Sequence, residues 1–171
     1  HLDIKPQNVL LTLDHRAKLT DFGLSRIARD AASNTKSCQS FGGGTIAYCS
    51  PEQSPMYDPQ ESQPAPPKSL QLKSDIYSFG LLLLEMLRGK PISALWSEEH
   101  QNIDAHQWRH IQLACIKGMK PSLQHLEPGW KKLIEDCLSL DPNARPDAST
   151  LHSRLCALHL PPDGIPKFVF R

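Results

Sequence analysis

Residues 73–88 constrain the fold of this chain more than any other stretch. Apolar side chains recur there at helical spacing and also occupy the remaining faces, namely Ile76, Phe79, Leu81, Leu82, Leu83, Leu84, Met86 and Leu87. Ser74 is a candidate N-cap, and Gly89 and Pro91 mark the end of the segment. A helix that is apolar on nearly every side has to be covered by other elements. We therefore expect a buried helix that runs through the centre of one domain.

Three later segments are apolar on one face only. Their apolar faces consist of Trp108, Ile111, Cys115 and Ile116; of Trp130, Leu133, Ile134, Cys137 and Leu138; and of Leu151, Leu155 and Leu158. Such spacing predicts amphipathic helices that pack against a core. Near the start of the chain, residues 9–11 and 17–20 are strand-like runs on either side of Asp14-His15-Arg16, which predicts a hairpin. The expected fold is mainly α, with one small β-hairpin.

The composition fits a single globular domain. The chain has 171 residues, of which 39% are hydrophobic, and its formal net charge of +1 gives no strong field for nucleic acid or an anionic membrane. The five cysteines are odd in number and widely spaced, which favours free thiols in a reducing compartment. No apolar run approaches the ~20 residues that a bilayer requires. We expect no signal peptide and no membrane segment in this fragment, and an intracellular, cytoplasmic location.

Two stretches lack apolar periodicity. Residues 25–44 are polar and rich in Ser, Thr and Gly, which predicts a long mobile loop. Residues 53–72 contain five prolines and are expected to form an irregular surface loop, more simply a tolerated insertion than a docking element.

Polar residues near the start of the chain indicate a function. Asp3, Lys5 and Asn8 are close in sequence, and Asp21 follows the predicted hairpin. The hairpin would make Asn8 and Asp21 neighbours. Phosphoryl transfer needs a carboxylate near the acceptor hydroxyl, metal ligands for the nucleotide phosphates and a cation on the transferred group. In this interpretation Asp3 accepts the hydroxyl proton, Lys5 neutralises the γ-phosphate, and Asn8 and Asp21 bind Mg²⁺.

The order of these residues resembles the eukaryotic protein kinases. Residues 1–8, which read His-Leu-Asp-Ile-Lys-Pro-Gln-Asn, are similar to the catalytic loop H-R-D-L-K-x-x-N, and Asp21-Phe22-Gly23 matches the D-F-G turn. Three further stretches are similar to family motifs in the family's order. They are residues 44–52, which resemble the substrate-side end of the activation segment, residues 74–80 and residues 141–146. Residues 25–44 correspond in the family to the rest of the activation segment. The resemblance covers most of the chain. It implies the C-terminal lobe of the α+β kinase fold at residues 1–160 and a tail at 161–171.

The resemblance also implies a substrate and cofactors. Lys5 and Thr45 are typical of the serine/threonine type, in which Thr45 would complete the acceptor site beside Asp3. Lys5, Asn8, Leu10 and Asp21 would contact ATP or its Mg²⁺, with Leu10 beneath the adenine. The partners implied are ATP and a protein that carries a Ser or Thr acceptor. The residues at 75–80, 130 and 145–146 resemble the tyrosine-kinase-like branch of the family.

Further resemblance concerns structural contacts. Glu52 and Arg145 match the two members of a buried ion pair, and Asp75 matches a residue that hydrogen-bonds the catalytic-loop backbone. His1 and Phe22 occupy packing positions that link the catalytic loop to the D-F-G turn.

Departures from the family pattern refine the prediction. Leu2 stands where an arginine often receives the activation-loop phosphate, so activity is predicted not to depend on that contact. Ser50 replaces the usual alanine. The chain contains no glycine-rich phosphate loop, no strand lysine and no hinge, so we expect this fragment to be inactive alone. Two alternatives remain open: a pseudokinase or scaffold that binds partners without turnover, and a truncated product that does not fold stably.

Overall fold

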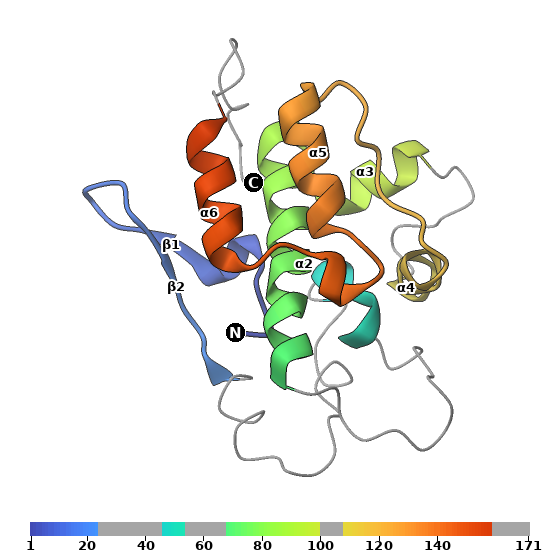
Figure 1. The fold of residues 1–171 in the computed structure, drawn as a ribbon, viewed down its shortest axis with the longest axis horizontal. Coiled ribbons are helices and arrows are strands. Elements are labelled where there is room, and N and C mark those ends of the chain that lie inside the picture. The colour runs from blue at the N-terminus through green and yellow to red at the C-terminus, as the bar shows by residue number, and fades with distance from the viewer. Residues whose placement is uncertain (24–45, 54–67, 100–107, 159–171) are drawn as a thin grey trace.

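The computed structural model describes residues 1–23, 46–53, 68–99 and 108–158. Figure 1 shows helices gathered around the long helix α2 (Lys68–Arg88), with a β-hairpin extending to one side. The described part contains five α-helices, four short 3-10 helices and one two-stranded antiparallel sheet. The prediction of a mainly α lobe with a small hairpin is confirmed.

Helix α2 is longer than predicted at its start. It begins at Lys68 rather than Lys73, so Ser74 lies inside the helix and is not its N-cap. The Ser74 hydroxyl instead donates to Glu52 Oε1 at 2.8 Å. The boundary was wrong, and the predicted loop does not extend to Leu72, because residues 68–73 are rich in Leu, Gln and Lys, which favour a helix. The predicted end is correct: Gly89 has φ 60° and donates to the Glu85 carbonyl at 2.9 Å.

The core surrounds α2, as its apolar pattern predicted. Leu81 and Leu84 are fully buried, and helix α5 (Pro128–Cys137) packs along α2 with Leu133, Ile134 and Cys137 also buried. Gly80 allows this close approach, because a Cβ there would lie 2.7 Å from the Cβ of Cys137. The two helices therefore form the central packing unit of the lobe.

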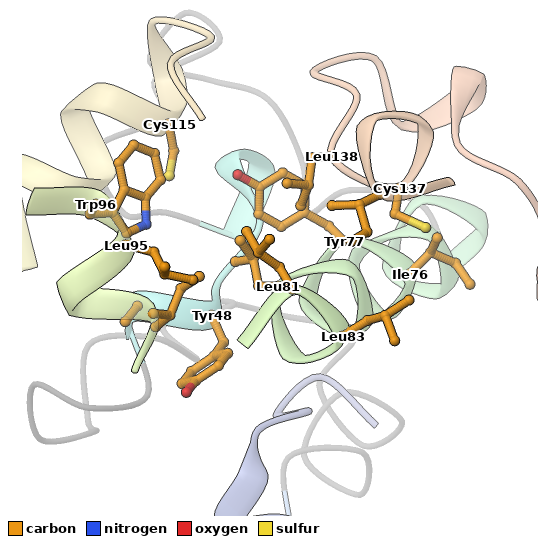
Figure 2. Packing of buried hydrophobic residues seen from close by; sticks show 14 of the residues in the cluster. Tyr48, Ile76, Tyr77, Leu81, Leu83, Leu95, Trp96, Cys115, Cys137 and Leu138 are labelled. Carbon is orange, nitrogen blue, oxygen red and sulfur yellow. The ribbon is translucent and has the colours of Figure 1, made fainter. Parts of the chain in front are cut away.

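Helix α3 (Ile92–Glu99) was not predicted. Its residues Ile92, Leu95 and Trp96 are buried, and Figure 2 shows Leu95 and Trp96 in the core with Leu81. The signal was their spacing of three and four residues directly after Pro91. Pro91 thus lies between two helices, after the end of α2 and directly before α3.

The remaining elements follow the sequence pattern. Helices α4 (Trp108–Ile116), α5 and α6 (Ala148–Ala157) confirm the three amphipathic segments. Strands β1 (Val9–Leu11) and β2 (Ala17–Leu19) pair with Val9 opposite Leu19, which confirms the hairpin. The 3-10 helices are η1 (Pro6–Asn8), η2 (Ile46–Tyr48), η3 (Pro51–Gln53) and η4 (Pro142–Ala144).

Two expectations from composition can be compared with the described residues. Cys49, Cys115, Cys137 and Cys156 are free thiols, as expected, whereas Cys38 lies outside the described part. Of the helices in that part, none has the length and apolar character to cross a bilayer.

Candidate active site

Helix α2 holds the beginning of the chain in place. The Asp75 carboxylate accepts from the backbone nitrogen of Leu2 through Oδ1 and from that of His1 through Oδ2, each at 2.7 Å. This confirms the backbone contact expected for Asp75. The loop that carries Asp3 is thus fixed to the central helix of the lobe.

Asp3, Lys5 and Asn8 form one cluster at the turn made by η1. Asp3 is only 6% exposed, and its Oδ2 accepts from the Lys5 ammonium and from Asn8 Nδ2, each at 2.9 Å. Asn8 Nδ2 also donates to the Asp3 carbonyl at 2.8 Å. The other carboxylate oxygen, Asp3 Oδ1, is buried and has no hydrogen-bond partner among the described residues. An acceptor in that state costs free energy unless a donor reaches it.

The hairpin brings Asp21 to its open end, where Asn8 precedes β1. The backbone nitrogen of Thr20 donates to the Asn8 carbonyl at 2.9 Å, so Asp21 follows the residue that is paired with Asn8. His1 reinforces this junction, because its Nε2 donates to the Thr20 carbonyl at 2.8 Å and its ring lies 4.7 Å from that of Phe22. The predicted packing of His1 and Phe22 is confirmed. Asp21 itself is exposed, with Oδ1 accepting from the Gly23 backbone nitrogen at 3.3 Å.

The side chains of Asn8 and Asp21 have oxygen atoms that suit Mg²⁺ as ligands. Asn8 uses its amide nitrogen twice on Asp3, so its amide oxygen is the atom that can bind a metal. Asp21 adds an exposed carboxylate. Magnesium prefers such oxygen ligands and completes its shell with waters and substrate phosphates. Within the described residues no group of three or more His, Cys, Asp or Glu side chains could hold a metal ion, so a more complete protein cage is not found there.

A buried ion pair joins Glu52, in η3, to Arg145, which directly follows η4. Arg145 is 2% exposed and contacts both carboxylate oxygens of Glu52, at 2.6 and 2.9 Å. It also donates to the carbonyls of Ser139 and Lys73, each at 2.9 Å. Burial alone would raise the pKa of Glu52, but the Arg145 guanidinium outweighs it and lowers this pKa below its usual value. The ion pair expected from the resemblance is confirmed.

Comparison with known proteins agrees with this arrangement. A family model described as "Protein kinase domain" matches residues 1–155. The chain belongs to the protein kinase family. Among its relatives are the receptor protein kinase WSS1 of Oryza sativa subsp. japonica, 32% identical over 92% of this chain, and receptor-interacting serine/threonine-protein kinase 3 of Rattus norvegicus, 32% identical over 90%. Serine/threonine-protein kinase A of Synechocystis sp. is 33% identical over 86% of the chain. The chain spans 17%, 30% and 26% of the length of these relatives.

Of the other two residues predicted at the site, only Leu10 is among the described residues. Leu10 lies on β1, beyond Asn8, and its side chain is 55% exposed. Thr45 lies outside the described residues, as do residues 24–44, which include most of the predicted activation segment. The structure therefore brings together Asp3, Lys5 and Asn8, and places Asp21 across the hairpin.

Sequence reasoning missed a second buried link between the substrate-side segment and α2. The Tyr48 hydroxyl donates a hydrogen bond to Glu85 Oε2, which also accepts from the Ile92 backbone nitrogen at 3.0 Å. Burial, followed by the neighbouring Glu85 carboxylate, raises the pKa of Tyr48 well above its usual value. The signal was Glu85 itself, an acid within the apolar stretch 79–87, which needs a buried donor.

Proposed function

We propose that this chain is the C-terminal lobe of a serine/threonine protein kinase, which transfers the γ-phosphate of ATP to hydroxyl groups of proteins. The observation that carries the proposal is the state of the Asp3 carboxylate. Its Oδ2 is held by Lys5 and Asn8, whereas its buried Oδ1 has no partner in the part of the chain that the structure describes. One oxygen is thus oriented, and the other can accept a proton from an acceptor hydroxyl.

The proposed step balances as follows. The acceptor oxygen forms a bond to the γ-phosphorus while its proton passes to Asp3 Oδ1. The bond between the γ-phosphorus and the oxygen that bridges to the β-phosphate breaks, and ADP leaves. Because Oδ2 is fixed by two donors, the carboxylate does not have to reorganise when the hydroxyl arrives, which is how a positioned group lowers a barrier.

Lys5 and the two oxygen ligands supply the remaining electrostatic requirements. The Lys5 ammonium lies 2.9 Å from Asp3 Oδ2, so its charge is beside the point at which the phosphoryl group would be transferred. Asn8 and Asp21 would hold Mg²⁺, which when bound neutralises charge on the phosphate oxygens.

The proposal also covers the roles of Thr45 and Leu10, the extent of the lobe and its location in the cell. Thr45 would complete the acceptor site, and Leu10, exposed on β1, would lie beneath the adenine of ATP. Residues 1–160 would form the lobe and 161–171 a tail, and the fragment would be inactive without the rest of the nucleotide site. The use of ATP, together with free thiols among the described cysteines, supports an intracellular, cytoplasmic location for this lobe.

The test uses the full-length protein that contains this chain. We expect transfer of labelled phosphate from Mg-ATP to a generic serine/threonine substrate. Asp3→Asn should lower kcat by about 10²–10⁴-fold, which is the usual contribution of a general base. Asp14→Asn is the matched control, since Asp14 is exposed on the hairpin and pairs only with Arg16 among the ion pairs of the described part.

Two results would contradict the enzyme assignment. One is a folded full-length protein without transfer, which would favour the scaffold alternative. The other is equal activity in Asp3→Asn and Asp14→Asn, which would remove Asp3 from the reaction.

A further inference from the structure

The side-chain amide of Gln53 joins the catalytic loop to the substrate-side segment. Its Nε2 donates to the Leu2 carbonyl oxygen at 3.4 Å. Its Oε1 accepts from the Ser50 backbone nitrogen at 3.3 Å and from the Ser50 hydroxyl at 3.0 Å. Leu2 directly precedes Asp3, so a single side chain connects Ser50 to the backbone that leads into the proposed catalytic carboxylate.

Leu2 has a backbone conformation that needs such support. Its φ is 68°, in the left-handed region that residues other than glycine rarely adopt. A conformation of this kind persists where the surrounding structure fixes it. Asp75 Oδ1 accepts from the Leu2 N–H at 2.7 Å, and Gln53 donates to the Leu2 carbonyl. Side chains from two other elements, α2 and η3, therefore hold both polar groups of this one residue.

We propose that Gln53 is a positioning residue of the phosphoryl-transfer site, an inference that rests on the proposed function. By holding the Leu2 carbonyl, Gln53 fixes the direction in which the chain enters Asp3, and so the orientation of the Asp3 carboxylate. The groups involved are neutral. Since the Leu2 side chain cannot bind an anion, this amide supplies the link between the catalytic loop and the substrate-side segment without any phosphate group.

The main test is Gln53→Met in the full-length protein, because methionine keeps the length of the side chain and removes its donor and acceptor. We expect kcat at saturating Mg-ATP to fall about tenfold, since misplacing a catalytic group by about 1 Å can cost about 10²-fold and the Asp75 contact remains. The KM for ATP should change by less than about twofold, because Asn8 and Asp21 do not contact Gln53 in any described hydrogen bond. A residue that acted only on folding would change the melting temperature instead of kcat.

Two further variants separate the halves of the link. Gln53→Glu keeps an acceptor for Ser50 but loses the donor to Leu2, and should lower kcat as much as Gln53→Met. Ser50→Ala removes one hydroxyl and should lower kcat about two- to threefold, with no further loss when it is combined with Gln53→Met, because residues in one hydrogen-bond network are not additive. Gln124→Met is the matched control, as Gln124 is an exposed glutamine elsewhere in the lobe.

The outcomes distinguish this inference from the proposed function. Full kcat in Gln53→Met, or an equal loss in Gln124→Met, overturns the positioning role while Asp3-dependent transfer in the unmutated protein upholds the kinase assignment. Should Gln53→Met not fold, Ser50→Ala decides, and unchanged kcat in that variant overturns the inference. Absence of transfer in the folded unmutated protein overturns both.

Discussion

Replacing Arg145 by methionine should destabilise the lobe far more than replacing an exposed arginine. The guanidinium is 2% exposed and makes two contacts with the Glu52 carboxylate and one with each of two backbone carbonyls. Methionine fills much of the same volume but leaves the buried Glu52 charge without its partner. Removing one member of a buried pair costs about 3–5 kcal/mol. For a domain of this size, at about 2–4 °C per kcal/mol, the melting temperature should fall by about 6–20 °C.

The assay is thermal and urea unfolding of the complete kinase domain, with Arg16→Met as the matched control. Arg16 pairs with Asp14 on the exposed hairpin, at 2.9 Å, and such surface pairs contribute less than about 1 kcal/mol. The double variant Glu52→Gln/Arg145→Met should recover part of the lost stability, because no unpaired charge then remains buried. A cost below about 1 kcal/mol for Arg145→Met, or a double variant no more stable than the single one, would refute this reasoning.

Two other predictions follow from packing and from acid titration. Gly80→Ala should destabilise the domain by about 1–3 kcal/mol in urea unfolding, because the new Cβ would lie 2.7 Å from that of Cys137. Gly89→Asn should cost much less, since asparagine tolerates the positive φ at that position. Equal costs for the two variants would contradict the packing argument. The lowered pKa of Glu52 means that its stabilising effect is present above the ordinary value of 4.5 and is lost as pH falls from there through the folded-state pKa. Unfolding measured from pH 6 to pH 3 should show that Glu52→Gln removes this part of the acid sensitivity, and an unchanged pH profile in Glu52→Gln would contradict the role assigned to the Arg145 contact.

The sequence predicted those parts of the fold that depend on local apolar periodicity. The central helix was evident from residues 76–87, and the hairpin from two strand-like runs around a polar turn. The start of α2 was misplaced because residues 68–72 follow a proline-rich stretch whose composition dominated the interpretation. Helix α3 was missed because eight residues after a proline give little periodicity to recognise.

The site was predictable to the extent that motif spacing and a local turn determine it. Asp3, Lys5 and Asn8 are neighbours in sequence, and the family resemblance supplied Asp75 and the pair of Glu52 and Arg145. The contact of Gln53 with Leu2 joins residues 51 apart in sequence, and that of Tyr48 with Glu85 joins residues 37 apart. Neither follows from periodicity or a motif, because each depends on how separate segments pack in three dimensions.

Helix α2 makes hydrogen bonds to the site segments from several positions along its length. Asp75 fixes the catalytic loop, the Ser78 hydroxyl donates to the Tyr48 carbonyl at 2.8 Å, and Glu85 accepts from the Tyr48 side chain. The spacing between the loop that carries Asp3 and the substrate-side segment is therefore set by the rise of α2, about 1.5 Å per residue. An insertion or deletion of one residue between Asp75 and Glu85 would turn these attachment points about 100° away from each other, so the length of this interval is as constrained as the identity of the residues within it.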